Sequence, residues 1–201
     1  LSGRRLEILN PSPLDIEIED IAHGLSFLAR WNGQTVGDYP FSVAQHSLLV
    51  ENIFSSHFPK MDNQSKLFAL LHDSAEYVIS DMISPLKAHL GMTYETLDEK
   101  LTMAICIRFN IPTTKIKIIK KQVKLADKTA AWLEAIQLAG FSKIEADKLF
   151  GKQVIVEGFE NYLSPATPFF VRKKFVNRFN ELYKLTDGGI KSDDNRNDKK
   201  C

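Results

Sequence analysis

An imidazole and two carboxylates, those of His72, Asp73 and Glu76, lie within five residues of one another. The spacing of apolar residues such as Leu67 predicts a helix over 63–79, on which each residue turns by about 100°. The three polar side chains then share the side of this helix that faces away from the apolar stripe. Such a group suits proton transfer or metal binding, and taken alone it equally suits an acidic stripe on the surface.

A second histidine and a further carboxylate are predicted to point toward apolar surroundings. His46 falls within the apolar stripe of a helix predicted over 42–58, and Asp127 falls on the shoulder of a similar stripe over 114–139. Each needs a partner, because the desolvation of a buried polar group is costly. Each residue also has an explanation that needs no shared site. His46 could be a hydrogen-bonded core histidine, and Asp127 could form an ion pair with a nearby lysine.

Taken together, His46, His72, Asp73 and Asp127 form a set of two imidazoles and two carboxylates. This donor set suits one divalent transition metal ion (Mn²⁺, Co²⁺, Fe²⁺, Ni²⁺ or Zn²⁺) better than it suits Ca²⁺ or Mg²⁺. Four protein ligands on a six-coordinate ion leave positions for water, which a divalent cation makes more acidic. If these side chains meet in space, the sequence predicts a hydrolytic site for a phosphoester.

The elements that must carry these residues are helices. Helical periodicity, N-capping residues and Pro or Gly boundaries occur along most of the chain, whereas the alternation typical of strands is nearly absent. Residues 152–157 could form a brief strand, although continuation of the preceding helix is the better interpretation. We therefore expect an all-α helical bundle in a single domain, with helices over 17–30, 42–58, 63–79, 85–90, 94–109, 114–139, 143–161 and 168–185.

The length of 201 residues also corresponds to a single domain, since domains commonly contain about 100–200 residues. We expect an extended, proline-containing arm over 1–16 and a helical domain over 17–186. The stretch 187–201 is rich in charge and poor in apolar residues, which predicts a disordered charged tail.

The overall charge argues against a general binder of nucleic acids or membranes. Lys and Arg number 26 against 25 Asp and Glu, for a net charge of +1. The lysine-rich run 115–128 is interrupted by apolar residues at helical spacing, which predicts an amphipathic helix rather than a nucleic-acid patch. Cys106 and Cys201 are too few for a disulfide framework. No stretch resembles a signal peptide or a membrane span, so we expect a cytoplasmic protein with a small-molecule ligand.

The wider pattern around the His-Asp pair resembles a known enzyme family. His72-Asp73-Ser-Ala-Glu76, followed by Asp81 and then by Pro85-Leu86-Lys87, is similar to the motifs of the HD-domain metal-dependent phosphohydrolases. The resemblance is closest to the bacterial 5′-deoxynucleotidase branch, the YfbR-like enzymes. An Arg-Trp pair upstream of the first-histidine helix adds to this resemblance, with Arg30-Trp31 standing before Val43-Ala44-Gln45-His46-Ser47.

The resemblance implies a role for each matching position. Metal ligation would fall to His46, His72, Asp73 and Asp127, proton transfer to Glu76, phosphate binding to Arg30, the pocket wall to Trp31, and preference for deoxyribose to Asp81. Alternatives that need no substrate are a helix-terminal ion pair for Arg30, core packing for Trp31 and a turn cap for Asp81.

These residues lead us to expect a phosphoric monoester hydrolase acting on (deoxy)nucleoside 5′-monophosphates. The resembling branch forms homodimers, which makes a homodimer the expected assembly. One alternative is an HD hydrolase of another phosphorylated metabolite or nucleotide, and another is a non-enzymatic helical interaction protein. The loop between Arg30 and His46 is longer than in the resembling branch, so the substrate pocket is expected to differ.

Overall fold

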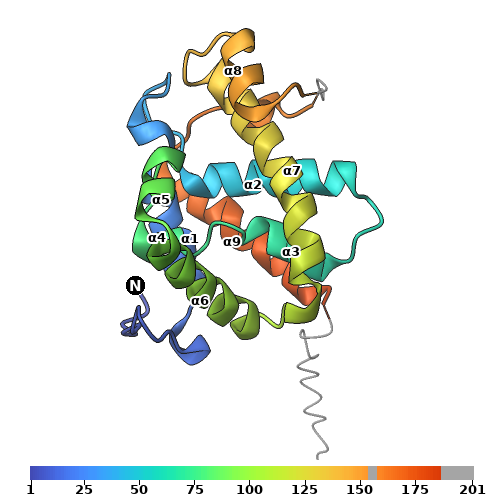
Figure 1. Cartoon of the computed structure of the whole chain (residues 1–201). Coiled ribbons are helices and arrows are strands. Elements are labelled where there is room, and N and C mark those ends of the chain that lie inside the picture. The colour runs from blue at the N-terminus through green and yellow to red at the C-terminus, as the bar shows by residue number, and fades with distance from the viewer. Residues whose placement is uncertain (154–157, 187–201) are drawn as a thin grey trace, which may run out of the picture.

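The computed structural model describes residues 1–153 and 158–186 of the chain (Figure 1). Within these ranges the regular elements are all helical and form a single-domain bundle, which confirms the predicted all-α class. The α-helices are α1 (Ile18–Phe27), α2 (Val43–His57), α3 (Asn63–Leu70), α4 (Glu76–Ile79), α5 (Ser84–Leu90), α6 (Met92–Arg108), α7 (Thr113–Gln137), α8 (Lys143–Phe150) and α9 (Pro168–Lys184), joined by short 3₁₀ turns at Pro13–Asp15, Arg30–Gly33 and Glu160–Tyr162.

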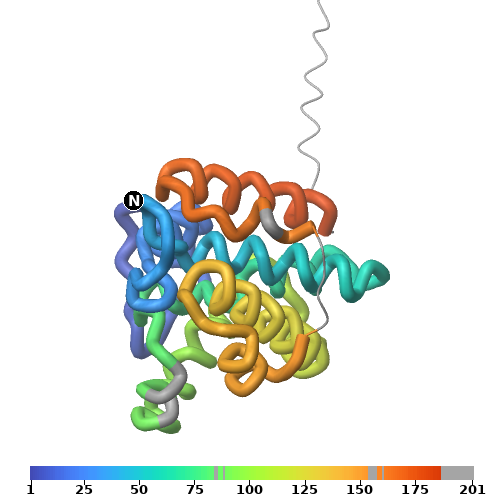
Figure 2. Tube along the Cα trace, turned by 90° about the horizontal axis from the view of Figure 1, so that it is seen from above, coloured from blue at the N-terminus to red at the C-terminus, as the bar shows by residue number. Residues whose placement is uncertain are grey.

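Helix α2 is the central element of the bundle. It packs against α1, α3, α7 and α9, and Figure 2 shows it between α9 on one side and α7 on the other. Because neighbours cover it on several sides, α2 buries polar residues as well as apolar ones, among them His46, Ser47 and Glu51. Arg178 of α9 pairs with Glu51 at 2.8 Å, whereas Ser47 Oγ has no hydrogen-bond partner within the described residues.

The prediction of one continuous helix over 63–79 is wrong. Helix α3 ends at Leu70, and tight turns with hydrogen bonds from residue i to i−3 lead into the short helix α4. The side chain of His72 explains part of this break, because its Nδ1 lies 2.9 Å from the carbonyl oxygen of Ala69. A side chain thereby satisfies a carbonyl at the helix end that would otherwise accept from the backbone of a following turn.

Two other predicted helices end earlier than expected. Helix α1 stops at Phe27 rather than at residue 30, and α8 stops at Phe150 rather than continuing to 161. Gly151 follows α8 with a φ of 81°, a backbone conformation that glycine adopts readily because it has no Cβ. Most of the stretch 152–157, for which a strand is the alternative to a helix, lies outside the described residues (154–157), and so does the predicted tail 187–201.

Helix α7 is amphipathic, as the interruption of its lysine-rich run predicts. Ile119 and Val123 are buried against the bundle, while Lys120 and Lys124 are exposed. In the part of the chain that the structure describes, no helix combines the length and the apolar composition that crossing a membrane requires.

The close approach of α1 to α4 generates a prediction about stability. A Cβ added at Gly24 would lie 2.9 Å from the Cβ of Tyr77, which is closer than real side chains pack. We expect Gly24→Ala to destabilise the fold by about 1–2 kcal/mol, because overpacking outweighs the gain in helix propensity of about 1 kcal/mol. Chemical denaturation measures this change.

The matched control is Glu19→Ala, an exposed position on the same helix. Its free energy of unfolding should stay within about 0.5 kcal/mol of the parent value. A Gly24→Ala protein as stable as the parent would contradict the packing of α1 on α4.

Candidate metal centre

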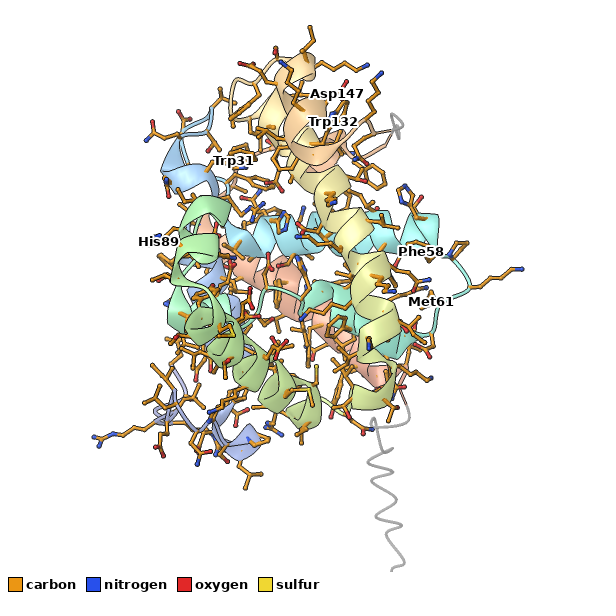
Figure 3. All side chains as sticks on the ribbon, in the orientation of Figure 1. Trp31, Phe58, Met61, His89, Trp132 and Asp147 are labelled. Atoms are coloured by element: carbon orange, nitrogen blue, oxygen red, sulfur yellow. The ribbon has the colours of Figure 1, made fainter. Side chains whose placement is uncertain are left out.

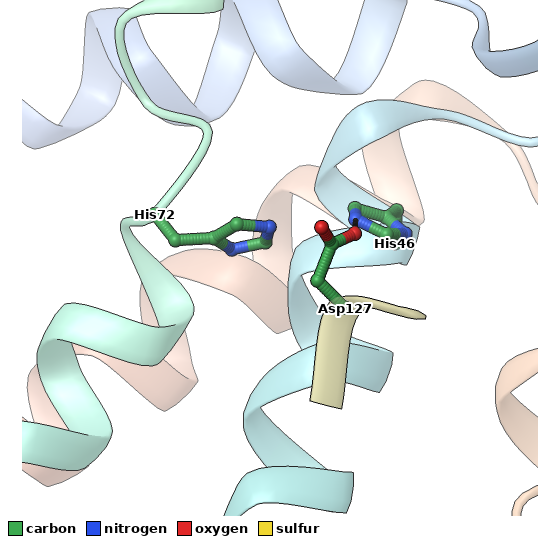
Figure 4. A group of neighbouring side chains, drawn as sticks. All are labelled: His46, His72 and Asp127. Atoms are coloured by element: carbon green, nitrogen blue, oxygen red, sulfur yellow. Dashed lines mark ion pairs between the residues drawn. The ribbon is translucent and has the colours of Figure 1, made fainter. Parts of the chain in front are cut away.

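Three elements bring two histidines and an aspartate to one point in the bundle. His46 comes from α2, His72 from the turn after α3, and Asp127 from α7 (Figure 4). One ligand atom of each residue lies within 4.8 Å of those of the other two. This spacing allows a single metal ion to contact all three residues, so the structure brings together side chains that are 81 residues apart (127 − 46) in sequence.

The hydrogen bonds of the two imidazoles leave the same ring nitrogen free on each. Nδ1 of His46 lies 2.5 Å from Oε1 of Glu134, and Nδ1 of His72 lies 2.9 Å from the carbonyl oxygen of Ala69. With the proton on Nδ1 in each case, Nε2 keeps a lone pair that can bind a metal. Both Nε2 atoms are buried, and neither makes a hydrogen bond within the described residues.

Asp73 and Asp127 complete the predicted ligand set. Oδ2 of Asp73 lies 3.4 Å from Nε2 of His46 and 3.2 Å from Nε2 of His72. Oδ1 of Asp127 lies 3.3 Å from Nε2 of His46, and its Oδ2 accepts a hydrogen bond from Lys124 at 2.6 Å. The lysine ion pair considered for Asp127 is therefore formed, but it uses only one of the two carboxylate oxygens.

The electrostatics of the group favour a cation. Burial opposes ionisation of Asp73 and Asp127, but the neighbouring histidines outweigh burial and hold the pKa of both carboxyls below its ordinary value. Burial and Arg30 oppose protonation of His46, yet Glu134 and the two aspartates raise its pKa well above the ordinary value. These pKa shifts arise because several carboxylates lie close together and attract positive charge. A divalent cation at this point would be attracted in the same way.

Sequence reasoning missed Glu134, which is fully buried behind His46. Its Oε1 faces Nδ1 of His46, and its Oε2 accepts from Nε and Nη2 of Arg30, both at 3.2 Å, and from Nε1 of Trp31 at 2.9 Å. A carboxylate behind a ligating histidine fixes the ring and its tautomer. A signal was present in the sequence, because Glu134 follows Asp127 by seven residues (134 − 127), about two helical turns on the same face.

A cavity of about 410 Å³ opens beside the ligand group, between α5 and α6 on one side and α7 on the other. Glu76 lines it and is 3% exposed; its Oε1 accepts from Nζ of Lys87 at 2.9 Å, while its buried Oε2 has no partner within the described residues. Burial, Asp73 and Asp81 raise the pKa of Glu76 to about 8, although Lys87 opposes the rise. This carboxyl can therefore exchange a proton near neutral pH.

Comparison with known proteins finds a relative that is similar over nearly the whole of both chains. An uncharacterized protein from Rhodobacter capsulatus is 52% identical over 190 residues, which span 94% of this chain and 96% of the relative. This chain belongs to the same protein family. No family model matches the sequence. Because the similarity covers nearly the whole of both chains, it includes every helix that carries the ligand group.

The residues predicted to bind substrate lie elsewhere than the cavity. The described residues that line the cavity do not include Arg30, Trp31 or Asp81. Arg30 binds Glu134 and lies 3.9 Å from Oδ2 of Asp81, so the ion pair considered for this arginine is formed. Lys87, which belongs to the Pro85-Leu86-Lys87 stretch of the motif and has no predicted role, does line the cavity.

The raised pKa of Glu76 predicts how stability varies with pH in the metal-free protein. Between the ordinary value of 4.5 and the folded value of about 8, the folded state holds the proton more tightly than the unfolded chain does. The contribution of Glu76 to the free energy of unfolding therefore falls as the pH rises through this range. The decline is at most on the order of 1.4 kcal/mol per pH unit.

We expect Glu76→Gln to flatten this decline, because the amide of glutamine does not ionise in this pH range. Denaturation in the presence of a chelator, at intervals from pH 5 to pH 8, measures the slope. The control is Glu95→Gln, an exposed carboxylate at the same cavity, which should keep the parent slope. Identical slopes for Glu76→Gln and the parent would contradict the burial of this carboxyl.

Proposed function

We propose that this protein is a metal-dependent phosphohydrolase that removes the phosphate from (deoxy)nucleoside 5′-monophosphates. The observation that carries the proposal is the pair of buried Nε2 atoms of His46 and His72. Neither makes a hydrogen bond within the described residues, and both face the carboxylate of Asp73. Polar atoms buried without partners are costly, and a metal ion would satisfy both at once.

The donor set fits one divalent transition metal ion. His46, His72, Asp73 and Asp127 would hold it, with Glu134 orienting the first of these ligands. When bound, such an ion makes a water molecule more acidic and polarises a phosphoryl oxygen. The mixture of imidazole and carboxylate donors favours Mn²⁺, Co²⁺, Fe²⁺, Ni²⁺ or Zn²⁺, without separating one from another.

Glu76 is the residue suited to proton transfer. Its Oε2 has no partner among the described residues and its carboxyl lines the cavity, so it can take a proton from the attacking water or give one to the leaving oxygen. Lys87 holds the other carboxyl oxygen at 2.9 Å and so limits the rotation of the group. In the metal-free protein, burial and the neighbouring carboxylates raise the pKa of Glu76 to about 8, which allows both protonation states near neutrality.

The substrate class rests on the motif pattern and on the size of the cavity. The stretch from His72 through Asp81 to Lys87 resembles that of the 5′-deoxynucleotidase branch of HD-domain enzymes. The cavity of about 410 Å³ falls within the range of about 300–1,000 Å³ for small-molecule sites. Another phosphorylated metabolite is the alternative substrate. A non-enzymatic interaction protein would gain nothing from the two buried Nε2 atoms, although burying them without hydrogen bonds costs desolvation free energy.

We expect metal-dependent release of phosphate from nucleoside monophosphates. Chelator treatment should abolish activity and added Mn²⁺ or Co²⁺ should restore it. Asp73→Asn and Asp127→Asn should each lower kcat/KM by about 100-fold or more, because even changes behind the ligands cost about 10- to 100-fold. Phosphate release at several metal concentrations provides the measurement.

The control for both variants is Asp62→Asn, the same chemical change at the N-cap of α3, where asparagine caps equally well. It should retain the parent activity. Phosphate release that persists without metal, or that is unchanged in Asp127→Asn, would refute the proposed mechanism.

A panel of ribo- and deoxynucleoside monophosphates tests the role implied for Asp81. The resemblance implies higher kcat/KM with deoxyribose substrates and a smaller ratio in Asp81→Asn, whereas the position of Asp81 outside the described lining of the cavity predicts the same ratio in Asp81→Asn and in the parent. Equal turnover of both sugars by the parent protein would remove this role. Hydrolysis of other phosphate esters, with no activity on the panel, would favour the alternative substrate class.

A further inference from the structure

The Arg30–Gly33 turn directs two consecutive side chains at one buried oxygen. Nε and Nη2 of Arg30 and Nε1 of Trp31 all donate to Oε2 of Glu134, at 3.2, 3.2 and 2.9 Å. The other oxygen of the same carboxylate faces Nδ1 of His46. One carboxylate therefore connects the turn to the ligand group.

The backbone of this turn adopts an unusual conformation that makes the convergence possible. Trp31 and Asn32 have φ values of 55° and 52°, in the left-handed region that residues other than glycine rarely occupy. The loop that follows is closed by backbone hydrogen bonds from Arg30 N to Phe41 O at 2.8 Å and from Val43 N to Leu28 O at 2.9 Å. Strained residues persist where their surroundings hold them, and such residues gather at functional sites.

Two aromatic side chains pack against the ring of Trp31. Its centroid lies 5.6 Å from that of Phe141 and 6.1 Å from that of Phe150. Phe141 follows the C-terminal end of α7, the end that also carries Glu134, and Phe150 is the last residue of α8. The indole is thus fixed both by aromatic packing and by its hydrogen bond to Glu134; Figure 3 labels Trp31.

We propose that Arg30 and Trp31 are positioning residues that hold Glu134 against His46, rather than residues that bind the substrate. This inference rests on the metal site of the proposed function. Two observations support it: the guanidinium faces the carboxylates of Glu134 and Asp81, and neither Arg30 nor Trp31 is among the described residues that line the cavity. Loss of a donor should loosen Glu134, and through it the orientation of His46.

Binding of Co²⁺ alone, followed by calorimetry and by visible absorption, tests the inference without substrate. Trp31→Phe keeps an aromatic ring and removes only the N–H donor. We expect it to bind Co²⁺ about 10-fold more weakly than the parent and to change the absorption spectrum of the bound ion, as changes behind metal ligands commonly do. Arg30→Lys, which keeps the charge and loses the fork, should act in the same direction and serves as the test if Trp31→Phe does not fold.

The matched control is Trp132→Phe. Nε1 of Trp132 donates to Oδ1 of Asp147 at 2.8 Å, so this variant loses the same kind of bond on α7 without removing a donor to Glu134 (Figure 3). It should bind Co²⁺ as the parent does. Any nonspecific effect of losing a buried indole donor would appear in both tryptophan variants.

The outcomes separate this inference from the proposed function. Parent protein that does not bind Co²⁺ would overturn both. Parent protein that binds Co²⁺, with Trp31→Phe binding it equally well, would overturn the positioning role alone. With saturating Co²⁺ and a hydrolysed phosphate ester, the positioning role predicts an unchanged KM for Trp31→Phe. A raised KM with unchanged Co²⁺ affinity would return Trp31 to substrate binding.

Discussion

The burial of His46 on the central helix is the constraint to which the rest of the site responds. Its imidazole is fully enclosed, with Glu134 on one ring nitrogen and Asp73 and Asp127 near the other. An enclosed polar ring is costly unless each of its nitrogens has a partner. Helix α2 can carry such a residue because the elements that pack against it bring Glu134 to one ring nitrogen and place two carboxylates close to the other, where a cation could bind.

The break between α3 and α4 is the second determinant of the site. A continuous helix would keep His72, Asp73 and Glu76 at fixed helical angles. The tight turns instead allow Asp73 to approach both imidazoles, while Glu76 turns into the cavity beside Lys87. Because His72 uses Nδ1 to bind the carbonyl of Ala69, the same interaction that satisfies the end of α3 also leaves Nε2 free for a ligand.

Helix α7 provides two layers of the centre from one face. Asp127 faces His46 directly, and Glu134, about two turns later, supports the same ring from behind. The turn at Arg30 and the long loop after it also support this arrangement. Backbone hydrogen bonds close the base of the loop, and the left-handed turn directs the donors of Arg30 and Trp31 at Glu134. The near-zero net charge of the chain therefore conceals a local concentration of carboxylates, of which Glu134 is held ionised chiefly by Arg30.

The sequence by itself determined the all-α class, the carrier helices α2 and α7, and the inward direction of His46, because helical periodicity and caps are local properties of the chain. It did not determine the break after Leu70, which depends on a side chain binding a backbone carbonyl, and it did not reveal Glu134. Only the tertiary structure decided which atoms face one another. The distances among His46, His72 and Asp127 follow from how three separate elements pack, and no pattern within any one of them encodes that arrangement.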